Sequence, residues 1–419
     1  MPTQQYGQSS LSSIGGKNTC NKLDKPRVLR IINRFNLGGP TYNVGYLTKY
    51  MEDEFETLLV GGMKDESEDS SEFIVEKLGL SPVIIPEMKR EINFKLDRIV
   101  YKKIKQIIKD FRPDIVHTHA SKSGAIGRLA AANMKVPIIL HTFHGHVFHS
   151  YFGQMKTMSY KKIERYLAKK STRLIAISDI QKHELAKVHK IAPENKFNVI
   201  PLGFDLQRFQ DDYEEKRTSF RNKYNVQNDE IAIGIIGRLV PVKNHKLFLK
   251  GIKYLVDNSR KKIRVFIIGD GELRPEIEQN CNHLHLEFGS HADNKLITFT
   301  SWVRDVSTVY PGLDIVVLTS LNEGTPVSLI EAQAANKPIV STNVGGIENV
   351  VIPQKTALLS NILDDQLFFE NLISLAESET KRKSMEQYGW KHVQAKFSYY
   401  RLVSDMKQLY FELLEENKK

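Results

Sequence analysis

The sequence has few cysteines and no long apolar run. Its 419 residues include only Cys20 and Cys281, too few for a disulfide framework, which favours a reducing compartment such as the cytoplasm. No apolar run approaches the roughly 20 residues that a membrane-spanning helix needs. Residues 1–25 are rich in Gln, Ser, Gly and Asn and lack the apolar stretch of a signal peptide, so we expect a disordered lead-in there.

Acidic residues are fewer than basic ones, 49 against 60, and the formal charge is +11. Such a balance suits nucleic acid, an anionic membrane surface or a phosphate-bearing substrate. Much of the excess lies in two predicted helical stretches. Residues 87–112 hold nine basic and four acidic residues, and residues 152–173 hold seven basic residues with Glu164 as the single acid. Both stretches could be ordinary solvated helix faces or a membrane-facing patch, and the sequence leaves the two interpretations open.

The chain shows no repeat of 20–50 residues, which excludes solenoids and propellers. Instead, short apolar runs alternate with helical patterns, and most runs are continuously apolar, as strands buried on both faces should be. This pattern predicts an α/β fold with parallel sheets. The expected strands are 27–33, 56–62, 82–86, 114–120, 137–143, 173–178 and 197–203 in the first half, and 230–239, 263–271, 296–302, 313–320, 338–343 and 356–360 in the second.

The polar segment 204–229 separates the two sets of strands and marks a domain junction. We therefore expect one Rossmann-like domain over 26–204, a second over 205–397, and a final amphipathic helix over 398–419. One stripe of that helix is apolar and should be packed. Its residues are Tyr399, Leu402, Val403, Met406, Tyr410, Leu413 and Leu414.

The first chemical motif is IIGRLVPVKNH, residues 235–245. A buried strand ends at Gly237 and is followed by Arg238 and, five residues later, Lys243. The end of a strand that opens into a helix is where doubly wound sheets bind anions. A guanidinium and an ammonium there can stabilise a leaving diphosphate without a metal ion. Taken alone, the motif could equally be a surface Arg and Lys.

The second motif is NEGTPVSLIEA, residues 322–332, which follows the predicted strand 313–320. Glu323 precedes a helix that should begin near Pro326, and its carboxylate can accept hydrogen bonds from sugar hydroxyls. Glu331, eight residues later, lies more than one turn into that helix and can hold a ribose diol.

Together these residues resemble glycosyltransferase family 4, retaining enzymes of the two-domain GT-B fold, over roughly residues 27–395. The resemblance implies that Arg238 and Lys243 bind the donor diphosphate, that Glu323 contacts the transferred sugar and that Glu331 binds the ribose. It also implies that the backbone of Gly324, Thr325, Pro326 and Val327 surrounds sugar and phosphate, and that the last helix crosses back to the first domain.

Further matches to the family are weaker. The resemblance gives a catalytic role to His144, donor contacts to Gly38, Gly39, Gly269 and Val303, and acceptor contacts to Gly39, His119 and Lys122. The segment GGIENVV, residues 345–351, lacks the proline usual in the family's corresponding stretch, which leaves the role of Glu348 undefined.

Other functions compete with this interpretation. Six of the thirteen histidines fall between His117 and His149 and could serve a metal-dependent hydrolase. The charge of +11 could serve a nucleic-acid-binding protein, and a phosphorylase would share the architecture. GDGELR, residues 269–274, does not fit a dinucleotide site because Arg274 stands at the third glycine position.

The favoured prediction is a cytoplasmic transferase at the inner face of the plasma membrane. Its donor would be a UDP-sugar and its acceptor a glycan or a lipid-linked glycan of the cell surface, with no metal, other cofactor or nucleic acid required.

Overall fold

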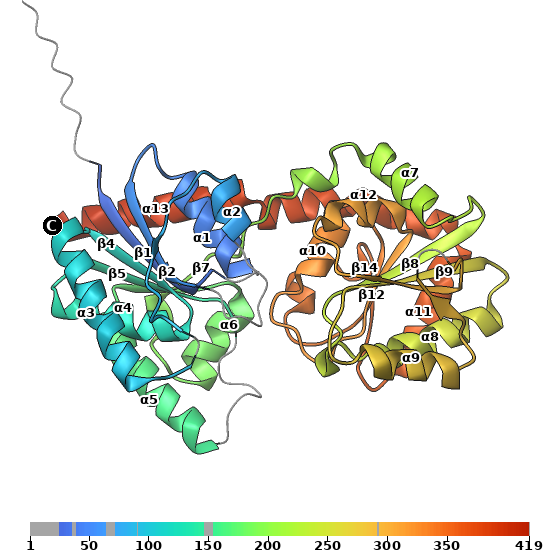
Figure 1. Cartoon of the computed structure of the whole chain (residues 1–419), viewed down its shortest axis with the longest axis horizontal. Helices are drawn as coiled ribbons and strands as arrows, with labels where there is room; N and C mark the ends of the chain where they lie inside the picture. The colour runs from blue at the N-terminus through green and yellow to red at the C-terminus, as the bar shows by residue number, and fades with distance from the viewer. Residues whose placement is uncertain are drawn as a thin grey trace, which may run out of the picture.

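The computed structural model describes residues 25–35, 39–63, 72–89, 91–145, 154–290 and 293–418. Within them the chain forms two domains side by side, and each is built on a seven-stranded parallel sheet (Figure 1). The predicted lead-in lies outside these residues apart from Lys25. Within the described residues, no helix combines the length and the apolar character that a membrane span requires.

The first sheet has the strand order β3-β2-β1-β4-β5-β6-β7. Helices surround it, as expected for a parallel sheet that is buried on both faces. The strands are β1 Arg27–Arg34, β2 Glu56–Gly62, β3 Val83–Ile84, β4 Ile115–His119, β5 Ile138–Phe143, β6 Arg173–Ala176 and β7 Phe197–Val199. The helices are α1 Gly39–Lys49, α2 Glu72–Lys77, α3 Phe94–Phe111, α4 Ser121–Asn133, α5 Gln154–Lys170 and α6 Asp179–His183.

The second sheet has the order β10-β11-β9-β8-β12-β13-β14. Its strands are β8 Glu230–Ile236, β9 Lys262–Ile268, β10 Phe288–Gly289, β11 Ile297–Ser301, β12 Ile315–Leu318, β13 Ile339–Thr342 and β14 Ala357–Ser360. The remaining helices are α7 Tyr213–Lys223, α8 His245–Asn258, α9 Arg274–His283, α10 Val327–Ala334, α11 Asp365–Glu377, α12 Glu379–Phe397 and α13 Tyr399–Lys418.

The predicted α/β class and the predicted strands are confirmed, with errors mainly at the strand ends. The run 230–239 predicts a strand through residue 239, but β8 ends at Ile236 because the chain then turns into the loop that carries Arg238. The two-residue edge strand β10 was not predicted, since it is too short to leave a pattern.

The chain crosses between the domains twice, and the two crossings run side by side. Phe204 in the first crossing donates its N–H to the Phe397 carbonyl at 2.8 Å, and the Tyr399 N–H donates to the Phe204 carbonyl at 3.1 Å. Asn43 of α1 fixes the first crossing by bonding both the N–H and the carbonyl of Gly203 at 2.9 and 3.1 Å. These bonds join the two crossings to each other and to α1.

The predicted C-terminal helix is present and crosses back to the first domain. In Figure 1, α12 and α13 run in red along one side of both domains, and the C-terminus lies beside the first. Leu402, Met406 and Tyr410 of α13 join the same buried cluster as Val28 of β1 and Ile138 of β5. Burial of each such side chain contributes about 1.5–3 kcal/mol to folding.

Candidate active site

The second-domain site forms where the strand order reverses. β8 is the first strand of its sheet, and β9 and β12 lie on its two sides, so the loops after β8 and β12 flank the switch point where such sheets bind ligands. The loop after β8 carries Gly237, at φ +153°, and Arg238, whose side chain is exposed. Among the described residues, the Arg238 guanidinium has no hydrogen-bond or ion-pair partner.

Lys243 and Glu323 meet across this switch point. The Lys243 ammonium lies 2.6 Å from Glu323 Oε1, and the two side chains are 20% and 12% exposed. The Ser320 hydroxyl donates to the same carboxylate oxygen at 2.6 Å, and the Thr319 hydroxyl donates to the Lys243 carbonyl at 2.9 Å. The sequence-predicted cation and carboxylate are therefore neighbours, held by side chains at the end of β12.

Glycines allow the loops around this pair to pack closely. A Cβ on Gly269 would lie 2.0 Å from the Gly237 carbonyl oxygen, so Gly269 lets the turn after β9 lie against the loop of Arg238. A Cβ on Gly346 would lie 1.8 Å from the Gly324 carbonyl oxygen. The Gly346 N–H also donates to the Glu323 carbonyl at 2.9 Å. The segment at 345–346 thus supports the loop that presents Glu323.

The helix after Glu323 begins as predicted. Pro326 is its N-cap and α10 starts at Val327. Gly324 is exposed, and a Cβ on it would meet nothing within 4 Å. The free N–H groups and the positive dipole end of α10 therefore lie next to the loop of Glu323.

Glu331 lies on α10 among polar groups from three other segments. The Tyr310 hydroxyl donates to its Oε2 at 3.0 Å, and the Arg208 guanidinium lies 3.5 Å from its Oε1. Arg208 also lies 3.8 Å from Asp305. Burial raises the pKa of Glu331 to about 7, while Arg208 and Tyr310 act to lower it. Tyr42 of α1 is close enough for its own pKa to respond to Arg208 and Glu331, although burial is the larger cause of its rise.

In the first domain, His117 belongs to a buried hydrogen-bond chain. Arg30 donates to the Tyr410 hydroxyl at 3.1 Å, and that hydroxyl lies 2.7 Å from His117 Nδ1. His117 Nε2 lies 2.8 Å from the Thr142 hydroxyl. Because a buried phenol proton needs an acceptor, the arrangement favours a neutral His117 that accepts at Nδ1 and donates at Nε2. Burial lowers its pKa well below 6.5. Both nitrogens are engaged, so His117 has none free for a metal ion.

His119 and His144 are brought together at the ends of β4 and β5. His119 Nδ1 lies 2.9 Å from His144 Nε2, and burial lowers the pKa of His144 to about 4. Lys122, at the start of α4, lies 2.6 Å from Asp97 Oδ1 and also bonds the Glu91 carbonyl. In the structure Lys122 therefore ties α4 to the start of α3, and its acceptor contact stays a prediction.

Some predicted site residues are not placed by these contacts. Gly38 lies outside the described residues, as do two members of the histidine cluster, His146 and His149. Val303 is half-buried against the second-domain core. No hydrogen bond or ion pair joins His144 to Glu323 within the described part of the chain. The two halves of the predicted site therefore stand on separate domains.

Comparisons with known proteins identify the family. Residues 38–208 match the family model described as Glycosyltransferase Family 4, and residues 216–392 match the one described as Glycosyl transferases group 1. The chain belongs to the family 4 glycosyltransferases. The recognised family, the GT-B fold and the enzyme class predicted from sequence are thereby confirmed.

Individual relatives cover most of the transferase. It is 29% identical, over 79% of its own length and 83% of the relative's, to the UDP-Gal:alpha-D-GlcNAc-diphosphoundecaprenol alpha-1,3-galactosyltransferase of Escherichia coli. It is 27% identical, over 80% and 86%, to the capsular polysaccharide biosynthesis glycosyltransferase CapM of Staphylococcus aureus. Anabaena HepE, solved in complex with UDP, superposes with a TM-score of 0.74 at 16% identity, over 92% of this chain and 100% of that one.

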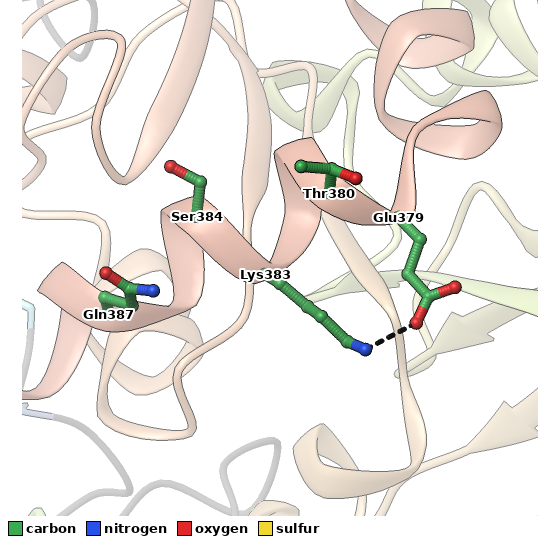
Figure 2. Close-up of a pocket in the computed structure, with 5 residues that line it drawn as sticks. All are labelled: Glu379, Thr380, Lys383, Ser384 and Gln387. Atoms are coloured by element: carbon green, nitrogen blue, oxygen red, sulfur yellow. Dashed lines mark ion pairs between the residues drawn. The ribbon is translucent and has the colours of Figure 1, made fainter.

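The comparisons give no support to the hydrolase or nucleic-acid alternatives. Within the described residues, no group of three His, Cys, Asp or Glu side chains could together hold a metal ion. A surface pocket on α12 is lined by none of the predicted site residues, and Figure 2 shows Glu379 and Lys383 paired beside it. That pair is 2.7 Å apart and largely exposed, so the pocket carries no site chemistry.

Sequence reasoning missed the residues that hold the predicted ones in place. Arg208 lies in the junction segment, which the sequence marks only as polar, and Tyr310 and Ser320 are single polar residues near apolar runs. The available signal was position, since Ser320 is the last residue of the predicted strand 313–320.

Proposed function

We propose that this glycosyltransferase transfers a sugar from a UDP-sugar to a glycan or lipid-linked glycan acceptor, with retention of anomeric configuration. The observation that carries the proposal is the Lys243–Glu323 pair at the β8/β12 switch point, with the exposed Arg238 on the adjoining loop. Two cations suit a diphosphate, and a carboxylate beside them suits the hydroxyls of the sugar attached to it.

The domain limits predicted from sequence, 26–204, 205–397 and 398–419, are part of this proposal. The first unit would hold the acceptor and the second the nucleotide-sugar. The side-by-side crossings at Phe204 and Ser398 support a hinge at these limits. His144 on the first domain would then reach the sugar on closure of the two domains.

The proposed reaction is a front-side displacement. The acceptor hydroxyl oxygen bonds to the anomeric carbon on the face that the β-phosphate oxygen leaves, and the proton of that hydroxyl passes to the departing phosphate. Arg238 and Lys243 stabilise the negative charge that accumulates on the diphosphate. Glu323 releases Lys243 to the phosphate and accepts hydrogen bonds from the sugar instead.

The UDP and acceptor assignments draw on the relatives. The Escherichia coli enzyme is named for a UDP-galactose donor and a diphosphoundecaprenol-linked acceptor, and the Staphylococcus aureus enzyme for capsular polysaccharide biosynthesis. We extend these roles to the present chain as a proposal for cell-surface polysaccharide synthesis. Thermal-shift assays against UDP, GDP and ADP test the base, because only a ligand of the folded state raises its stability. Stabilisation by GDP or ADP but not UDP would contradict the donor assignment.

We propose further that the reaction requires no metal ion, because Arg238 and Lys243 supply the positive charge. Activity with an acceptor should survive excess chelator. Loss of activity with chelator, restored by a divalent cation, would contradict this part of the proposal.

Binding to an anionic membrane at the cytoplasmic face completes the proposal. α4 packs against both α3 and α5, which lie on one side of the first domain (Figure 1). Glu164, the one acid of the basic stretch 152–173, faces inward and pairs with the buried Arg128 at 2.8 Å. Apolar side chains beside the basic ones are exposed: Ile92, Phe94, Ile99, Met158, Ile163 and Tyr166.

Vesicle sedimentation tests the membrane surface. Binding to vesicles that contain anionic lipid should fall when Lys162 and Lys169 of α5 are changed to Glu, while UDP binding stays unchanged. The matched control is Lys253→Glu on α8 of the second domain. Equal binding by the α5 variant and the wild type would remove the membrane assignment.

A further inference from the structure

His119 and His144 form a hydrogen bond that no role predicted from sequence requires. His119 is the last residue of β4 and is 1% exposed. Its Nδ1 lies 2.9 Å from Nε2 of His144, and the two ring centroids are 5.2 Å apart. The other face of His119 is close to the His117 ring, with centroids 4.2 Å apart. His119 is therefore enclosed between a fixed histidine and His144.

The fixed neighbour limits how His119 can move. His117 is held at both nitrogens, by Tyr410 of α13 and by Thr142 of β5. Its ring is thus part of the folded core and gives His119 a rigid surface to pack on. Burial and the neighbouring histidines keep the pKa of His119 well below 6.5, so it is neutral at physiological pH.

Two neutral imidazoles that share one bond have a defined hydrogen-bonding capacity. One of the two bonded nitrogens carries the proton and the other accepts it. In the part of the chain that the structure describes, the remaining nitrogens, His119 Nε2 and His144 Nδ1, are buried and have no partner. Since each neutral ring has a single N–H, one of these nitrogens is a donor and the other an acceptor. The two roles exchange when both rings change tautomer, that is, when one proton moves across the shared bond and a second is relocated between His144 Nδ1 and His119 Nε2.

We propose that His119 is a positioning residue for His144. The shared bond occupies Nε2 of His144 and leaves Nδ1 as the atom that meets a hydroxyl group of the bound sugar. Because the pair can present a donor or an acceptor at that atom, it can match a hydroxyl in either orientation. This inference rests on the proposed function of His144 and adds to it the group that orients the ring.

The pairing itself can be tested without turnover. Long-range 1H–15N spectra of the full chain with 15N-labelled histidines report which ring nitrogens carry protons. We expect only one of His119 Nδ1 and His144 Nε2 to be protonated in the wild type. Protons on both nitrogens, or on neither, would overturn the proposal.

The positioning role is tested by kinetics. His119→Ala should lower kcat about 10–100-fold, the usual effect of losing a group that orients a functional one, while UDP affinity stays within about twofold. His119→Asn should recover most of the loss, because an Asn amide places a polar atom where Nδ1 stood. His183→Ala, at an exposed histidine of α6, is the matched control.

A double variant separates positioning from an independent role. In the His144→Ala background, His119→Ala should have little further effect on kcat, because the residue that it orients is already absent. The proposal would be overturned if the effects of His119→Ala and His144→Ala on kcat were fully additive, or if His119→Ala kept the wild-type kcat. A wild-type protein that transfers no sugar but shows the complementary protonation would instead refute the proposed function and leave the pairing intact.

Discussion

Arg238 and Lys243 both follow β8, yet within the described ranges only Lys243 is paired with another side chain. Arg238 is exposed, and its guanidinium has no partner among the described residues, so under the proposed function its N–H groups are available to the donor phosphates. Lys243 is held 2.6 Å from Glu323 and, under the proposed function, exchanges that carboxylate for phosphate. The Ser320 hydroxyl donates to the same carboxylate oxygen at 2.6 Å, so Glu323 keeps one hydrogen-bond partner in that exchange.

Replacing either cation should remove charge stabilisation that is needed mainly in the transition state. We expect Arg238→Ala and Lys243→Ala each to lower kcat by about 10²–10³, with unchanged thermal unfolding. Steady-state kinetics with a UDP-sugar and an acceptor measure the effect. Lys253→Ala, a half-buried lysine paired with Asp257 on α8, is the control. Near-normal turnover in both site variants would contradict their assignment.

The raised pKa of Glu331 predicts a pH-dependent donor affinity. With a pKa of about 7, the carboxyl is mostly ionised at pH 8 and mostly protonated at pH 6. A ribose diol donates best to the ionised form, so UDP-glucose should bind up to about tenfold more weakly at pH 6 than at pH 8. The phosphates of UDP-glucose remain ionised over this range. Calorimetry should show that the UDP-glucose affinity of Glu331→Gln does not change between pH 6 and pH 8. If the affinity changed with pH equally in the wild type and in Glu331→Gln, a group other than Glu331 would be responsible.

At the scale of elements, loops hold the site and strands supply its frame. The strands were predictable because continuous apolar runs such as IAIGII and IRVFII leave a strong pattern. Glu323, Glu331, Arg238 and Lys243 could be singled out as candidates because their types and spacing are specific together, and the structure places Lys243 beside Glu323. Contacts such as Arg208 with Glu331 were not predictable, because they join residues 123 positions apart that only the folded chain brings together.

The glycines behind the Glu323 loop should be sensitive to small substitutions. Gly346→Ala would place a methyl group 1.8 Å from the Gly324 carbonyl oxygen, so the loop must move. We expect at least about a tenfold loss of donor affinity and about 1–3 kcal/mol of destabilisation. Gly79→Ala is the control for donor affinity alone, because a Cβ there meets nothing within 4 Å, whereas its φ of +66° makes that substitution destabilising too. UDP-sugar affinity unchanged in Gly346→Ala would show that the loop does not need this support.

The buried end of α13 offers a test of the bond chain to His117. Tyr410→Phe removes the hydroxyl between Arg30 and His117, leaving two buried polar groups without their partner. We expect the free energy of unfolding to fall by about 1–3 kcal/mol. Tyr400→Phe, a tyrosine of the same helix that is 68% exposed, should change it little. Denaturant unfolding measures both, and equal effects would contradict the assigned role of the hydroxyl.

At the scale of the whole molecule, the two halves of the site lie on different domains joined at Phe204 and Ser398. The sequence predicted the two domains and the returning helix, because a polar junction separates two sets of strands. It could not give the backbone pairing of the crossings, which depends on two segments almost 200 residues apart. Under the proposed function, the domains close on the donor so that His144 reaches the sugar held beside Glu323.

A structure with a UDP-sugar bound tests the central claim most directly. The account predicts that the diphosphate oxygens lie within about 3 Å of the Arg238 guanidinium and the Lys243 ammonium. It also predicts the ribose diol on Glu331 and the sugar hydroxyls on Glu323. A donor bound elsewhere, or bound here with these four side chains directed away from it, would contradict the account.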